Sequence, residues 1–252
     1  MTLWRLEWLR LIRTKRWIVL LGVFLFFGLV GPFTARYIGE IVSFAGGGAQ
    51  GISIEFPPPV PADGLAQYSS NAMQLGTLVA VIVASSSLAF DAIPEMGIFL
   101  RSRVSEVRTI LTPRFVVSTV AVVGSYFVGV VAAWYETWVL IGAPDAGAVM
   151  IGAAYGAVFL IFAISLVAAM SGRATSVLGT VISTIVVLLL LQVIGVVEVV
   201  GRWLPTHLAG AITALVAGDT SSTHYLGTVS ITLVACVVLL WIATKLAEHR
   251  EL

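Results

Sequence analysis

Charge is the scarcest feature of this chain. Charged residues make up 11% of its 252 residues, whereas hydrophobic residues make up 59%. Soluble domains usually contain about a quarter of charged residues, so the lipid bilayer rather than water is the natural solvent for most of the sequence. The net charge is only +1, and nothing in its distribution favours nucleic acid as a partner. The composition therefore predicts an integral membrane protein.

Cysteine and the common catalytic motifs are almost or wholly missing. Cys236 is the only cysteine, which excludes an intrachain disulfide and suggests no cysteine-based metal site. The sequence has no G-x-S-x-G, no H-E-x-x-H and no paired acidic motif, so we expect no catalytic, cofactor-binding or metal-binding residues and no enzyme activity in this chain. A phosphate-binding loop of the form G-x-x-x-x-G-K-[ST] is absent too. Any ATP must therefore be bound by another chain.

Long apolar runs fill the rest of the sequence. Six of them are long enough to cross about 30 Å of hydrocarbon. With the N-terminus inside, only Arg36 and Arg202 of the 14 Lys and Arg residues fall in outer connections, which predicts cytoplasmic termini. We expect an all-α polytopic fold, a single transmembrane domain over 1–252 in the cell membrane. The predicted spans are about 17–38, 70–93, 113–135, 147–170, 174–197 and 225–245.

Two segments outside these runs have patterns of their own. Residues 1–16 place Trp4 and Trp8 on one helical face and Arg10 and Arg13 opposite, which predicts an amphipathic helix at the membrane interface. A basic flank that only fixes the orientation explains the same charges equally well. Residues 198–224 are too polar to cross the membrane and too apolar to leave it, so we expect a re-entrant helical hairpin in the outer leaflet.

The charged stretch between the second and third spans is the main candidate for contact with a soluble partner. Pro94 indicates a helix stop followed by a new start. From Met96 onward, apolar residues recur at helical spacing, and Arg101 and Arg108 fall on the other side. Thr112-Pro113 then supplies a cap and a first-turn proline for the next span. The pattern predicts a short cytoplasmic amphipathic helix over 94–110.

The order of these parts resembles the membrane subunits of type 2 class ATP-binding cassette (ABC) exporters, which include drug, sodium and polysaccharide exporters. The resemblance covers the whole chain: an amphipathic N-terminal helix, six spans, a re-entrant segment before the sixth, and a glutamate-to-glycine element after the second. Here that element is Glu95-Met96-Gly97, followed by residues 98–105 and Thr109-Ile110-Leu111.

What the resemblance implies is a permease half similar to those of multidrug exporters. The segment over 94–110 would be the coupling helix that rests on an ABC ATPase subunit, and that ATPase would bind ATP and magnesium. A second permease half, identical or paralogous, would complete the pathway. The residues expected to contact the ATPase are Glu95, Met96, Gly97, Phe99, Leu100, Arg101 and Arg103.

Polar residues inside the spans are few, and they favour either a pathway or helix packing. A bundle that faces lipid gains nothing from polar side chains, whereas a wet interface between subunits, or helix contacts within one subunit, satisfies them. Scarce charge favours hydrophobic or amphiphilic cargo over sodium or a polar glycan. A scaffold or sensor subunit that docks a non-ATPase partner is the alternative function. The candidate pathway residues are Ser69, Ser70, Asn71, Gln74, Thr77 and Gln192.

Overall fold

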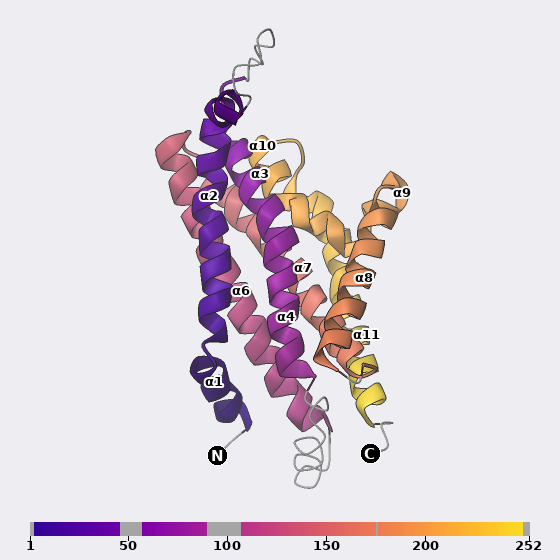
Figure 1. Ribbon diagram of the computed structural model, residues 1–252. Coiled ribbons are helices and arrows are strands. Elements are labelled where there is room, and N and C mark those ends of the chain that lie inside the picture. The colour runs from indigo at the N-terminus through magenta and orange to yellow at the C-terminus, as the bar shows by residue number, and fades with distance from the viewer. Residues whose placement is uncertain (1–2, 46–56, 90–106, 175, 249–252) are drawn as a thin grey trace.

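The computed structural model describes residues 3–45, 57–89, 107–174 and 176–248, and this part of the chain is helical without a strand. Six helical stretches are long and apolar enough to cross a membrane, which is the architecture of a multi-pass membrane protein. In Figure 1 the helices stand side by side, and both termini lie at one end of the bundle, here called the terminal end. The opposite end, with α9 and α10, is called the distal end. The helices are α1 (Leu3–Arg13), α2 (Arg16–Ala45), α3 (Pro61–Asn71), η1 (Ala72–Gly76), α4 (Thr77–Leu88), α6 (Val107–Leu140), α7 (Ala146–Ser171), α8 (Val177–Gly195), α9 (Glu198–Gly201), η3 (Pro205–Gly210), α10 (Ala211–Ala217), η4 (Ser222–Tyr225) and α11 (Leu226–Glu248).

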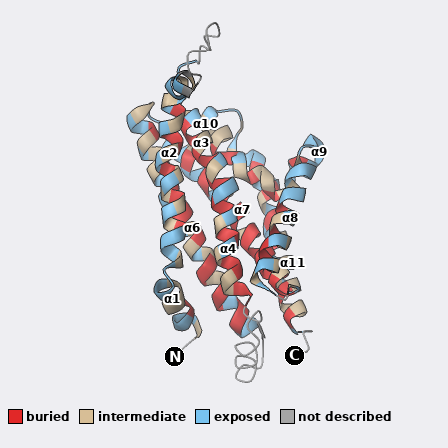
Figure 2. Ribbon diagram, in the orientation of Figure 1, coloured by how far each residue is buried: buried red, intermediate tan, exposed pale blue. Residues whose placement is uncertain are grey.

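Helix α7 is the centre of the bundle. It is apolar all round, a pattern typical of a helix that is covered on every side, and it is the most buried of the six candidate spans. It packs against α4, α6, α8, α10 and α11. Figure 2 shows buried residues along α7 and on the sides of its neighbours, whereas few residues of α8 are buried. The exposed apolar residues of α8 suit lipid or another subunit.

Small residues allow α2, α3 and α6 to approach closely. A Cβ atom on Gly28 of α2 would lie 2.5 Å from the carbonyl oxygen of Gly129 on α6, so the two backbones are in direct contact. Tyr68 of α3 is fully buried between them and donates a hydrogen bond of 2.9 Å to the carbonyl of Tyr126. These contacts fix the position of α3, and with it the position of the polar residues that follow Tyr68.

Two helix boundaries differ from the expectation. The second span begins at Pro61 rather than near residue 70, because Pro61 fits the first turn and the Asp63 carboxylate accepts a hydrogen bond of 2.8 Å from the Val60 amide. The expected cap at Thr112-Pro113 is not formed. Pro113 instead lies inside α6, which runs from Val107 to Leu140. Residues 107–112 are already helical, so Thr112 does not have the extended backbone of a helix cap.

Candidate functional site

A groove crosses the distal end through three adjoining cavities. The first, of about 960 Å³, shares Ala66 and Ser70 with the second, of about 260 Å³. The second in turn shares Gln192 and Thr206 with the third, of about 630 Å³. Because neighbouring cavities share lining residues, they lie side by side, and together they are here called the lateral groove. Its lining includes Arg36, Asp63, Ser70, Gln74, Gln192 and Thr206.

The groove is built by helices that lie far apart in the sequence. Its first part lies between α2 and α3, its middle between α3, η1 and α8, and its last part between α8, α9 and η3. Phe159 of α7 contributes an aromatic side chain to the middle. The groove therefore lies on the face formed by the first, second and fifth candidate spans.

The sequence-predicted polar residues meet in the middle of this groove. Ser70, Gln74 and Gln192 are exposed and line the second cavity together, although Gln192 is more than a hundred positions away in sequence. The Gln74 amide donates a hydrogen bond of 3.3 Å to the Ser70 hydroxyl. The Gln74 and Gln192 side chains thus present amide groups on an otherwise mainly apolar face, where they are available to a ligand or to a facing subunit.

Ser69, Asn71 and Thr77 occupy different places. Ser69 also lines the second cavity, but its side chain is 3% exposed and its hydroxyl donates a hydrogen bond of 2.9 Å to the Ala209 carbonyl. Thr77 is 4% exposed and lies inside the bundle. Neither Thr77 nor Asn71 lines the three cavities. Ser69 is therefore a connector between helices, whereas Ser70 and Gln74 face the open groove.

The predicted ATPase contacts fall within 90–106, outside the described residues. They are Glu95, Met96, Gly97, Phe99, Leu100, Arg101 and Arg103.

A π-helical turn shapes the groove at Gln74. Residues Ala72–Gly76 form η1, which joins α3 to α4 within the second span. Single π-turns are rare and occur often at functional sites, because the widened turn changes which side chains face a given direction. A Cβ atom on Gly76 would lie 2.6 Å from the Phe24 ring, so the glycine allows α2 to pack against the π-turn.

The segment from α9 to η4 forms the remaining wall, and several contacts hold it on the bundle. A Cβ atom on Gly152 of α7 would lie 2.5 Å from the Ile212 Cα, so α10 rests directly on the backbone of α7. The Tyr155 hydroxyl donates a hydrogen bond of 2.8 Å to the Ser222 carbonyl. The Thr228 hydroxyl donates one of 2.7 Å to the Arg202 carbonyl. These contacts anchor the wall to α7 and α11.

The charged groups of the groove lie toward its two ends. The guanidinium groups of Arg36 and Arg202 lie over the rings of the adjacent Tyr37 and Trp203, at 5.5 and 5.3 Å from the ring centres. Burial lowers the pKa of His207 from its usual value, and the neighbouring His224 lowers it further. This favours the neutral form of His207, which lines the third cavity. The middle cavity has no charged side chain in its lining.

Some lining residues have no signal in the sequence. Thr206, Thr213 and Phe159 line the middle cavity because the α9 to η4 segment folds over α7, and no local pattern indicates this.

Among the described residues, no group of three or more His, Cys, Asp and Glu residues could hold a metal ion. Comparison of the chain with protein-family models, curated proteins and solved structures finds no match. The lateral groove thus has uncharged polar groups at its centre and apolar side chains around them.

Proposed function

We propose that this chain is the membrane subunit of an ATP-driven ABC exporter and that the lateral groove forms one wall of its pathway. The observation that carries the proposal is the meeting of Ser70, Gln74 and Gln192 in one open groove. Exposed amide and hydroxyl groups are costly against lipid, so a wet or occupied interface is the better environment for them. The groove also lies on the face of the spans expected to form that interface.

A single chain provides only half of such a pathway. The groove is open on one side, so a second permease half, identical or paralogous, would close it. The sequence contains no phosphate-binding loop, and the energy would come from partner ABC ATPase subunits that bind ATP and magnesium. Residues 94–110 would form the coupling helix, with both termini on the same cytoplasmic side in the cell membrane.

The helices at either end support this topology. On α1, Trp4, Trp8 and Ile12 are exposed, and Arg5 and Arg13 flank them, as expected of a helix that lies on an anionic membrane surface. The α9 to η4 segment contains only short helices, and its longest apolar stretch, Pro205–Ala217, is too short to cross. A re-entrant segment that returns to the outer face accounts for both its length and its position at the distal end.

The lining of the groove favours hydrophobic or amphiphilic small molecules as cargo. A sodium ion needs several oxygen ligands, usually with a carboxylate, and the middle cavity has no acidic side chain. A polar glycan needs many hydrogen-bonding partners, whereas Met73, Phe159 and Ala209 make much of this wall apolar. A drug-like molecule with a polar group and an apolar body fits both features.

Replacement of Gln74 by Trp tests the groove directly. The indole ring would fill much of a cavity of about 260 Å³, so most export of amphiphilic dyes such as ethidium should be lost while subunit level and basal ATP hydrolysis stay normal. Leu75→Trp is the matched control, because Leu75 is 51% exposed on the same turn and does not line the groove. Equal export by the two variants would place the path elsewhere. Recovery of a non-ATPase partner in place of a nucleotide-binding subunit would favour a scaffold or sensor.

A further inference from the structure

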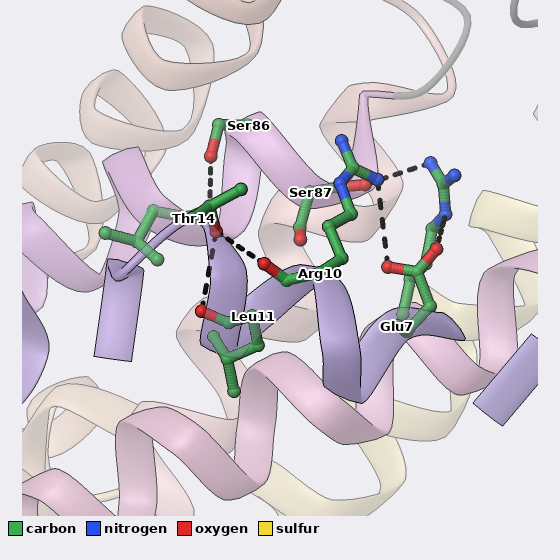
Figure 3. A network of polar contacts seen from close by, with 8 residues as sticks. Glu7, Arg10, Leu11, Thr14, Ser86 and Ser87 are labelled. Atoms are coloured by element: carbon green, nitrogen blue, oxygen red, sulfur yellow. Dashed lines mark hydrogen bonds and ion pairs between the residues drawn. The ribbon is translucent and has the colours of Figure 1, made fainter. Parts of the chain in front are cut away.

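A buried ion pair at the terminal end is the strongest feature that the groove does not explain. The Arg114 Nε atom of α6 lies 3.0 Å from the Glu7 Oε1 atom of α1, and both side chains are 5% exposed. Within the described part of the chain, they are the only charged residues that are buried. Figure 3 shows Glu7 directed into this junction from α1. Charges removed from water are costly unless they are paired, so the pair must form whenever α1 occupies this position.

Arg114 also connects α1 to the end of α4. Its Nη1 atom donates a hydrogen bond of 3.1 Å to the carbonyl oxygen of Ser87. α4 ends at Leu88, and the last carbonyls of a helix have no partner within the helix, so a guanidinium group is a favourable cap there. The Nη1 atom of Arg10 lies 3.7 Å from the other Glu7 oxygen, which places the carboxylate between two guanidinium groups. One side chain thus joins α1, the end of α4 and the beginning of α6.

The burial pattern of α1 shows why this pair matters. Glu7 is the buried residue of α1, whereas Trp4, Leu6 and Trp8 are each more than 40% exposed. Leu3, Leu9 and Leu11 are partly buried, but no apolar side chain of α1 is fully buried, so apolar packing is only one part of what positions α1. The turn into α2 contains Lys15 with φ 56°, a left-handed conformation that residues other than glycine seldom adopt. This turn and the ion pair therefore both contribute to the direction of α1.

We propose that Glu7 and Arg114 form a clamp that holds α1, the end of α4 and the start of α6 as one unit. α4 ends at Leu88 and α6 begins at Val107, so the clamp would hold the ends of these two helices in one fixed arrangement with α1. Its role in coupling rests on the proposed function, because this is the end on which an ATPase would act. Arg114 and Glu7 are positioning residues: they touch no cargo, and they would make α1 move together with α4 and α6.

A double apolar variant separates positioning from simple stability. Glu7→Gln removes the carboxylate that pairs with the buried Arg114, so it should lower the amount of folded protein. Arg114→Gln should lower it less, because Arg10 still lies 3.7 Å from the Glu7 carboxylate. Glu7→Leu combined with Arg114→Met removes both charges and should restore folding, but it has no directional contact to hold α1. The matched control is Glu248→Gln, which breaks an ion pair at the same end between side chains that are 45% and 37% exposed.

The first measurement is the distance distribution between spin labels at two exposed positions, Arg5→Cys on α1 and Arg108→Cys on α6, in a Cys236→Ser background. We expect a narrow distribution in the parent and in Glu248→Gln, and a broad one in the double apolar variant. The second is ATP hydrolysis stimulated by cargo in the reconstituted complex, which should fall about fivefold or more in the double variant. A narrow distribution or unchanged stimulation in that variant would overturn the clamp. Failure to find any ATPase partner would count against the proposed function, and the spin-label distances would still decide the clamp.

Discussion

Substitution of Gly152 by alanine tests how the wall of the groove is held. Gly152 lies on α7, where α10 crosses it. An added Cβ atom would lie 2.5 Å from the Ile212 Cα and 2.8 Å from its amide nitrogen, and both are backbone atoms that cannot rotate away. Carbon atoms in contact are normally about 3.5 to 4.0 Å apart. α10 must therefore move away from α7 by about 1 Å.

The cost of this movement follows from two opposed effects. Overpacking of a close contact costs about 1–3 kcal/mol. The replacement of a helical glycine by alanine returns about 1 kcal/mol through the lower backbone entropy of the unfolded chain. We expect a net loss of about 0–2 kcal/mol for Gly152→Ala. The Ser69–Ala209 hydrogen bond, 2.9 Å long, would be stretched beyond bonding distance by the same movement, which distorts the middle of the groove.

Gly124→Ala is the matched control. Gly124 is an exposed glycine of α6, and nothing lies within 4 Å of an added Cβ atom. Only the stabilisation of about 1 kcal/mol from replacing a helical glycine by alanine therefore applies to Gly124→Ala. The two variants should differ by about 1–3 kcal/mol, measured as the midpoint of thermal unfolding in detergent. Each kcal/mol corresponds to about 2–4 °C for a domain of this size. Equal midpoints, or a higher midpoint for Gly152→Ala, would refute the close contact between α7 and α10.

Two further predictions concern the groove and its topology. Ser69→Ala should lower stability by about 1–2 kcal/mol because it leaves a carbonyl without its donor, whereas the adjacent Ser70→Ala should leave unfolding unchanged, since Ser70 is exposed. Both changes in stability can be measured as the midpoint of thermal unfolding in detergent. A similar loss for the two substitutions would contradict the buried position of Ser69 and the exposed position of Ser70. Single cysteines at Arg202 and Asp219 in a background without Cys236 should both react with an impermeant thiol reagent added outside. Labelling of one from outside and of the other only from inside would exclude a re-entrant segment.

The number of spans could be predicted because apolar length alone determines it. All six predicted runs correspond to helices that are long and apolar enough to cross a membrane. The start of the second span was missed because Asp63 and Gln67 make its first turns too polar for a hydropathy criterion. In the fold, Asp63 accepts the cap hydrogen bond and Gln67 lines the groove, so their polarity has local uses that an average over a window does not detect.

The polar residues of the groove could be predicted in part, because polar residues within apolar runs are easily recognised in the sequence. Ser70, Gln74 and Gln192 are conspicuous as polar residues in apolar runs, and the fold brings them together. The different role of Ser69 depends on a carbonyl 140 positions away, which no local pattern specifies. Glu7 likewise belongs by its spacing to a solvated helical face. Its burial follows only from the position of Arg114, 107 residues further along the chain.

The second span connects the two polar features of this chain. α3, η1 and α4 form one helical stretch from Pro61 to Leu88, with Ser70 in the groove at one end and the Ser87 carbonyl bonded to Arg114 at the other. An α-helix is stiff along its axis, so movement of α4 at the terminal end would be carried toward the groove. The π-turn at Ala72–Gly76 is the place where the hydrogen-bond pattern changes, and π-turns are among the few places where helices kink sharply. Gln74 lies within this turn, so a change in the turn would move its side chain within the groove.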